Sequence, residues 1–295
     1  MKNIILFLAC IATLPGQTLA PAQLTKDGST TRIWIEKSDA KKITYRENPK
    51  SVNRLVASTR DTSIFFFTPP EYSTALALYE NRQYGEAKPA FAAAREKYKF
   101  TNQLQGNFST LAGFYEIECT RKLGNYEEIE TLFKTFKPGP LLLKTHQTQL
   151  EINPIYNAIR TEDWPRLNIL CDEWSEKRVT GSIRAQLEYA HGLALKGLGK
   201  PEEALNALNK ALVADYAASE ILVRKAALAC FAIYTEHPEV QLARKLHGTP
   251  DESPNSAGAL LLSEAAALVE MWNTALGRGE ALPDDYKAFL KFKKA

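Results

Sequence analysis

The chain has few of the residue types and motifs that usually carry chemistry. Among its 295 residues are four cysteines, two methionines and four histidines. The zinc spacing H-E-x-x-H, the nucleophile elbow G-x-S-x-G and the phosphate-binding G-x-x-x-x-G-K-[ST] are all absent. We therefore expect no catalytic residue, no bound metal and no cofactor, and we predict that the chain is not an enzyme. An enzyme whose site these motifs do not describe is the remaining alternative.

The histidines and cysteines are too scattered to form a recognisable site. His146, His191, His237 and His247 occur singly, and His191 falls on a packed helix, where a satisfied core or edge histidine is the expected state. Three cysteines follow residue 22, and without a C-x-x-C pair they indicate neither a disulfide framework nor a zinc site. We expect buried free thiols, with a Cys119–Cys171 bridge between neighbouring repeats as the alternative. The third of these cysteines is Cys230.

Neither charge nor hydropathy is extreme. The formal net charge is +3, with 24% charged and 45% hydrophobic residues. This balance does not favour a nucleic-acid partner or a strongly cationic membrane surface. After the first twenty-odd residues, no run reaches the ~18 apolar residues that a membrane span needs, so no transmembrane span is expected.

The first 22 residues have the layout of a secretory signal peptide. Lys2 precedes the apolar run Ile4–Leu14, Pro15-Gly16 ends it, and Ala20-Pro21-Ala22 provides a small-x-small cleavage site before Gln23. The mature chain is thus predicted to be exported, to the periplasm or the extracellular space, free or associated with the envelope. Lipidation at Cys10 is disfavoured because cleavage there would split the apolar run.

Residues 23–68 read as a compact β module. Asp27-Gly28 precedes the alternating segment Thr31–Glu36, and polar turns separate the later strand candidates. We expect a small SH3-like β-barrel or sheet, with Phe65 to Phe67 at its junction with the helices that follow. The later strand candidates are Lys42–Arg46, Arg54–Ser58 and Ile64–Phe67.

From Pro69 the apolar residues fall at helical intervals and recur as a repeat. In each copy an aromatic residue or proline is followed by small or bulky apolar residues at +3, +7 and +10, which places all four on one helical stripe. The four copies are Tyr84, Ala87, Phe91, Ala94; Tyr126, Ile129, Phe133, Phe136; Trp164, Leu167, Cys171, Trp174; and Pro201, Ala204, Leu208, Ala211.

One copy, "YAHGLALKGLGKPEEALNALNKALVAD", resembles a tetratricopeptide repeat (TPR). Gly192 matches the family's first-helix glycine, Gly199-Lys200 its tight turn, and Ala204 and Ala211 its small second-helix residues. The other copies have Ala75, Ile117 and Ile155 in place of the glycine. The resemblance extends over residues 69–248 and implies an α-solenoid of helical hairpins.

Proline positions locate the helix starts. Pro165, Pro201 and Pro238 stand where second helices should begin, a position whose N–H has no partner within the helix. Pro89 and Pro154 fall inside predicted helices, where we expect kinks or shifted boundaries.

Residues 249–295 are expected to form capping helices. After the polar stretch "TPDESPNS", Ala257–Leu276 is apolar nearly all round, which predicts a helix buried against several neighbours. The segment Pro283–Lys294, with charged outer residues, would close the stack.

If the array binds a partner, its concave face is the expected place. The family's groove positions correspond to aromatic and charged residues, a composition typical of peptide-binding surfaces. The alternative interpretation is that these aromatics only fill a tight superhelix. The candidate groove residues are Tyr72, Tyr79, Phe114, Glu118, Arg121, Tyr156, Arg160, Tyr189 and Lys196, with Leu76, Ile152 and Leu193 beside them.

The sequence thus predicts a non-catalytic, exported scaffold that binds a protein or peptide partner. The alternative is a cell-wall or glycan-associated envelope protein whose β module contacts glycan through Trp34 and Tyr45. The sequence identifies neither the partner nor the oligomeric state.

Overall fold

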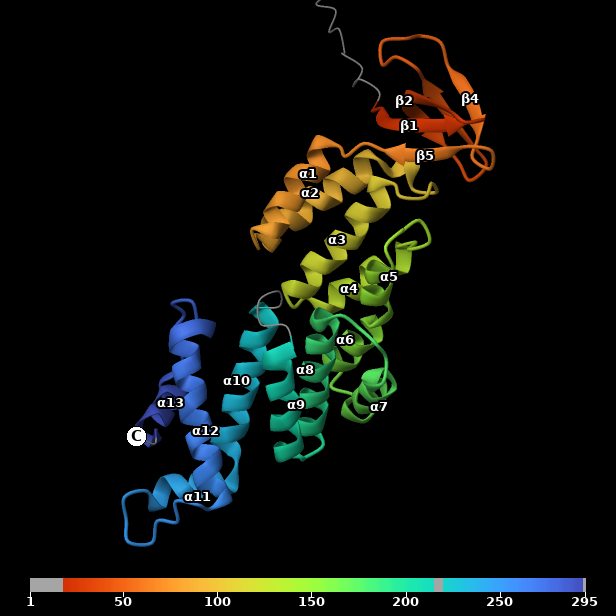
Figure 1. Cartoon of the computed structure of the whole chain (residues 1–295). Helices are drawn as coiled ribbons and strands as arrows, with labels where there is room; N and C mark the ends of the chain where they lie inside the picture. The colour runs from red at the N-terminus through yellow and green to blue at the C-terminus, as the bar shows by residue number, and fades with distance from the viewer. Residues whose placement is uncertain (1–17, 215–219, 294–295) are drawn as a thin grey trace, which may run out of the picture. The chain divides into compact units, whose positions relative to one another are not determined.

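The computed structural model describes residues 18–214 and 220–293, which fall into two compact units, Met1–Gln147 and Thr148–Ala295. The chain is mainly helical with one small antiparallel sheet, which confirms the coarse fold class (Figure 1). Most of the expected signal peptide, residues 1–17, lies outside the described residues.

The sheet in the first unit has five strands in the order β4-β3-β2-β1-β5, all antiparallel. It is an open sheet, so the barrel alternative is not confirmed. The sequence interpretation missed β1, which begins at Ala20 and so includes the last residues of the expected leader. The strands are β1 (Ala20–Lys26), β2 (Ser29–Ser38), β3 (Lys42–Arg46), β4 (Leu55–Ser58) and β5 (Ser63–Phe66).

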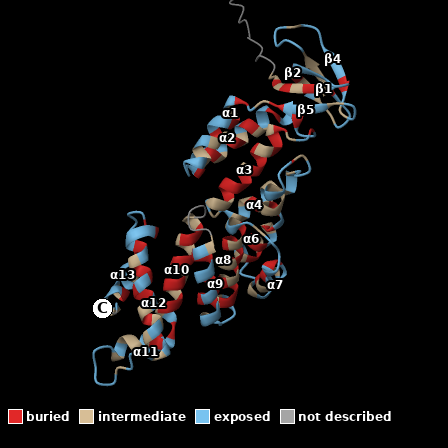
Figure 2. Ribbon diagram, viewed as in Figure 1, coloured by how far each residue is buried: buried red, intermediate tan, exposed pale blue. Residues whose placement is uncertain are grey.

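The first hairpin and the inner face follow from the sequence pattern. Asp27 and Gly28 have φ angles of 49° and 75°, the left-handed conformation that a two-residue type I′ turn requires. Alternate residues of β1 and β2 point inward, and the inner face packs on the end of the second helix and the loop beyond it (Figure 2). The buried core of this region comprises Ala20, Ala22, Leu24, Ile33, Ile35, Ile43, Ala57, Phe66, Tyr98 and Leu104.

Both outer strands leave backbone groups without a strand partner among the described residues. Apolar side chains are exposed there: Val56 on β4 is 64% exposed and Phe65 on β5 is 66% exposed. The sheet therefore has two open, partly apolar edges.

The first unit continues with helices that pack against their sequence neighbours. They are α1 (Pro70–Glu80), α2 (Tyr84–Lys97), the short 3₁₀ turn Lys99–Thr101, α3 (Phe108–Lys122), α4 (Tyr126–Thr135) and the start of α5 (Lys144–Glu151).

The second unit likewise pairs consecutive helices, with extensive contact between α8 and α9. Its helices are α6 (Asn153–Arg160), α7 (Trp164–Ser175), α8 (Gly181–Gly197), α9 (Pro201–Ala214), α10 (Glu220–Glu236), α11 (Pro238–Leu246), α12 (Ala257–Met271) and α13 (Asp284–Lys287).

Most of the predicted helix signals are confirmed. Pro165, Pro201 and Pro238 lie in the first turns of α7, α9 and α11. No helix boundary falls at Pro89, which lies inside α2. Pro154 marks a shifted boundary, because the expected single helix divides into α5 and α6 around Ile152.

Four helix-to-helix turns share one geometry. In each, the middle residue has a positive φ, and the N–H of the next residue donates to the carbonyl five positions earlier, as in a Schellman motif. The middle residues are Arg82 (64°), Gly124 (80°), Glu162 (52°) and Gly199 (75°). Each stands two residues before the first residue of a repeat copy, so the four copies share a local structure as well as a sequence pattern.

A glycine sets the distance between α8 and α9. A Cβ added at Gly192 would lie 2.5 Å from Leu208 Cγ and 3.2 Å from the Ala204 carbonyl oxygen. In α3 the corresponding close contact is at Gly113, where an added Cβ would lie 3.0 Å from the Phe136 ring. Gly113 lies one helical turn before Ile117, the position that corresponds to Gly192 in the repeat pattern. Ile117, at the position of the pattern's glycine, is buried.

The C-terminal region departs from the prediction in two ways. The predicted helix Ala257–Leu276 ends as an α-helix at Met271 and continues as a π-helical turn, Trp272–Leu276. It is not buried all round, since Leu260 is 50% exposed and Met271 is 45% exposed. The buried stripe faces α10 and α11, and the 3₁₀ turn Ala288–Phe292 packs on the same helix.

Gly192→Ala is expected to lower the free energy of unfolding by about 1–3 kcal/mol, because the new methyl group overlaps Leu208. Gly85→Ala is the matched control, since a Cβ at Gly85, near the start of α2, meets nothing within 4 Å. Urea unfolding of both variants measures the difference. A Gly192→Ala protein as stable as the control would contradict the close crossing.

Glu162→Gly is expected to stabilise the protein by about 0.5–1 kcal/mol, because glycine adopts a positive φ without the steric cost that a side chain carries. Gly199→Ala, at the matching turn and with open space around it, should cost about 1–2 kcal/mol. Thermal unfolding of the two variants tests the shared geometry. If the melting temperatures of both variants shifted in the same direction, the two turns would not share one geometry.

Candidate functional site

In the first unit, three of the five predicted groove residues contact one ring, that of Tyr115 on α3. Tyr72 and Tyr79 of α1 lie among aromatic rings with Tyr115 of α3, which stacks on Phe91 of α2 at 5.1 Å. Phe114 stacks on His146 with ring centroids 4.3 Å apart. The sequence pattern therefore brings these side chains together.

The burial of these aromatic side chains shows whether they pack in the core or could contact a partner. Tyr72 and Phe114 are each 4% exposed, so neither presents a surface to a partner. Burial raises the pKa of Tyr72 and of Tyr79 and lowers that of His146, so all three favour their neutral forms at neutral pH. For Tyr72 and Phe114 the structure supports the filling interpretation, whereas Tyr79 is half-buried.

The charged groove residues of α3 form an internal ion pair. Arg121 donates from Nε and Nη2 to the two carboxylate oxygens of Glu118, at 2.9 and 2.7 Å. Their side chains are 11% and 8% exposed. Breaking such a pair leaves a charge without its partner, so this pair holds a fixed geometry and is not a readily available ligand site.

Lys122, which the sequence analysis did not select, has an unusual environment. Its ammonium lies 5.3 Å from the Tyr84 ring centroid and 5.9 Å from that of Tyr79. Burial, together with the nearby positive charges of Arg121 and Arg82, lowers the pKa of Lys122 to about 8. The two rings favour the cation and partly offset this cost.

In the second unit, the four groove residues differ in accessibility. Tyr156 of α6 is buried, and its hydroxyl donates to the amide oxygen of Gln186, which also receives a bond of 2.9 Å from Gln149. Arg160 is exposed and bonds to the Asn157 amide oxygen at 2.8 Å.

The two groove residues on α8 are half-buried. Tyr189 packs against the core of the unit. Lys196 pairs with Glu236 of α10 at 3.1 Å.

In the β module, Trp34 and Tyr45 lie on opposite faces of the sheet. Trp34 pairs with Arg46 and Ile35 pairs with Tyr45, so the two aromatics alternate in direction. Tyr45 packs against the inner core. The two residues proposed for glycan contact therefore do not share one face of the sheet.

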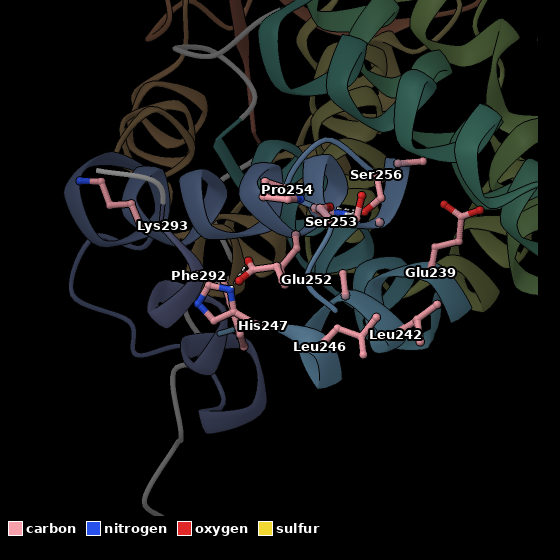
Figure 3. A pocket seen from close by; sticks show the side chains of 15 residues that line it. Glu239, Leu242, Leu246, His247, Glu252, Ser253, Pro254, Ser256, Phe292 and Lys293 are labelled. Carbon is pink, nitrogen blue, oxygen red and sulfur yellow. Dashed lines mark hydrogen bonds and ion pairs between the residues drawn. The ribbon is translucent and has the colours of Figure 1, made fainter. Parts of the chain in front are cut away.

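A pocket of about 480 Å³ between α11, α12 and the C-terminal turn was not predicted from the sequence (Figure 3). Its walls are mostly apolar, with Leu242 57% exposed beside it. At its rim, His247 Nδ1 lies 2.8 Å from a Glu252 oxygen, and the other oxygen accepts the Gly248 N–H at 2.7 Å. Part of this rim comes from the polar stretch "TPDESPNS", which the sequence analysis treated only as the break between the repeats and the capping helices.

The remaining reactive groups are dispersed. Cys119, Cys171 and Cys230 are free and buried, and burial raises the pKa of each thiol to about 12, so they stay protonated at neutral pH. Within residues 18–214 and 220–293, no three histidine, cysteine or carboxylate side chains group as metal ligands. No helix in this described part is long and apolar enough to cross a membrane.

Comparison of the chain with family models, with curated proteins and with solved structures finds no match.

Lys122→Met is expected to stabilise the protein at pH 7 by on the order of 2 kcal/mol and to have little effect at pH 10. Because the pKa in the folded state is about 8, below the ordinary 10.5, the unfolded chain binds the proton more tightly. The charged Lys122 therefore destabilises the folded state fully below pH 8, and this destabilisation disappears as the pH rises toward 10.5. Urea unfolding of Lys122→Met and of the exposed control Lys134→Met at both pH values measures it, and an equal effect at both would contradict the shifted pKa.

Proposed function

We propose that this chain is a non-catalytic, exported scaffold whose TPR-like helical hairpins bind a protein or peptide partner. The observation that carries the proposal is the shared turn geometry at Arg82, Gly124, Glu162 and Gly199. Turns of one kind at matching positions of the four copies support a repeat architecture, and repeats of paired helices form extended binding surfaces. Export is inferred from residues 1–22, and it leads to the periplasm or the extracellular space.

The binding surface we infer in the second unit is narrower than the sequence indicated. Tyr156 is buried, so the accessible members are Arg160, with Tyr189 and Lys196 on α8. Among the described residues, Arg160 has no carboxylate partner, and its guanidinium keeps donors available for an acidic group. An extended peptide with carboxylate and apolar side chains fits this combination.

In this proposal the polar and aromatic residues of the first unit are structural. Tyr72 packs α1 against α3, Phe114 packs α3 against His146 of α5, and the Glu118–Arg121 pair lies within α3. We expect substitution of these residues to lower the stability of the fold.

Crosslinking pull-down from envelope extract tests the proposal with three versions of the full chain: the wild type, Arg160→Glu and Arg178→Glu. Arg178 is an exposed arginine beyond the end of α7, so its reversal changes the charge equally without touching the inferred surface. We expect a partner that the wild type and Arg178→Glu capture and that Arg160→Glu loses by about tenfold or more, the effect of one charge-assisted contact. Absence of a specific partner, or equal loss from both variants, would contradict the proposal.

A further inference from the structure

The outer face of the sheet carries an ordered set of side chains that the helical scaffold does not use. On this face, residues of β2, β1 and β5 stand directly opposite one another across the strands, and Phe67, just after β5, donates its N–H to the Pro21 carbonyl at 3.1 Å. Trp34, Pro21 and Phe67 form one row, and Arg32, Gln23 and Phe65 form the next. Pro21 belongs to the expected leader, so we define the aromatic platform as the other five residues, Trp34, Phe67, Arg32, Gln23 and Phe65.

Contacts between the side chains fix the platform. The Arg32 guanidinium lies 5.2 Å from the Trp34 ring centroid and 5.1 Å from that of Phe67. Phe67 in turn meets Phe65 edge to face at 6.1 Å. These two cation–π contacts restrain the guanidinium while leaving its N–H groups able to donate.

The platform is open to solvent and polar at one end. Phe65 is 66% exposed. Beyond the Arg32 row, the hydroxyls of Thr25 and Thr30 lie 3.1 Å apart across β1 and β2. From the strand spacing, the face is about 10 Å wide across the three strands.

Electrostatics select an acidic ligand. Residues 18–68 contain nine basic and five acidic residues, a formal charge of +4 against +3 for the whole chain. Among the described residues, Arg32 has no carboxylate partner. The only acidic residue of β2, Glu36, is engaged by Arg46 and Arg54.

We propose that the aromatic platform binds an acidic polysaccharide. The C–H faces of sugar rings pack on flat apolar and aromatic groups, and Arg32 receives the acid group. Gln23, Thr25 and Thr30 bond the hydroxyls. This site is independent of the helical surface, so either proposal can fail without the other.

The geometry disfavours other polyanions. Nucleic acids owe most of their affinity to contacts between several lysines or arginines and the phosphates. Among the described residues, Arg32 is the one platform cation, so the platform favours a ligand held mainly by packing of its rings, with one acid group bound by Arg32. Peptides usually add to a sheet edge or fill a groove, and the platform is a flat face.

Four soluble polymers test the proposal against the purified full chain. Polygalacturonate carries sugar rings and carboxylates, dextran carries sugar rings alone, poly-L-glutamate carries carboxylates alone, and poly(U) carries bases and phosphates. Affinity electrophoresis at physiological salt ranks them, and we expect polygalacturonate to be bound most tightly. Equal or tighter binding of any other polymer, or no binding of polygalacturonate, overturns the proposal.

Matched variants then place the site. Arg32→Gln should weaken polygalacturonate binding about tenfold, whereas Arg60→Gln, the same charge change in a loop outside the platform, should leave it within twofold. Phe65→Ser should weaken binding severalfold, and Val56→Ser, at a similarly exposed residue of β4, should not. Arg32→Lys, which keeps the charge but not the planar guanidinium, should be intermediate, and circular dichroism confirms that each variant is folded. Equal losses from Arg32→Gln and Arg60→Gln would show non-specific attraction and overturn the assignment.

Discussion

At several helix–helix contacts the two helices approach so closely that the residue at the contact is glycine, whose side chain is a single hydrogen atom. The packing of the rest of the structure depends on these close contacts. At Gly192 the neighbour is Leu208 of α9, and at Gly113 it is Phe136. At Gly258 the neighbour is the backbone itself, since an added Cβ would lie 2.2 Å from the Glu239 carbonyl oxygen. Because backbone cannot be displaced as a flexible side chain can, the approach of α11 to α12 is the strictest of the three. The pocket lies between these two helices, so the same contact positions its walls.

Local signals in the sequence predicted the helices well. Prolines at Pro165, Pro201 and Pro238 marked helix starts because a first-turn N–H has no acceptor within the helix. The repeat stripe also held in part: Phe91 and Leu208 are fully buried, whereas Phe133 is only half-buried. The turns were less visible. Gly199 signals a positive φ, but Arg82 and Glu162 adopt the same conformation without any residue preference that reveals it.

The sequence was less informative about strands and sites, for physical reasons. The strand β1 begins with Ala20 and Pro21, residues of low strand propensity, and it is a strand because β2 and β5 pair with it on both sides. The repeat pattern located groove positions on α1, α3, α6 and α8. Whether a side chain at such a position is exposed depends on neighbours that are distant in the sequence. Tyr156 is buried because it meets Gln186, thirty residues on, and this contact leaves no local trace. The aromatic platform likewise depends on register, which brings Phe65 beside Gln23 and Arg32.

The open edges of the sheet have a consequence for the behaviour of the protein in concentrated solution. Within the described part of the chain, β4 and β5 each offer backbone groups without a strand partner beside exposed apolar side chains, the arrangement through which sheets of separate molecules join edge to edge. The surplus of basic residues in the same module opposes this, because like charges keep such modules apart. Since the repulsion acts over about 8 Å at physiological ionic strength and over about 3 Å in molar salt, high salt removes the protection and favours self-association.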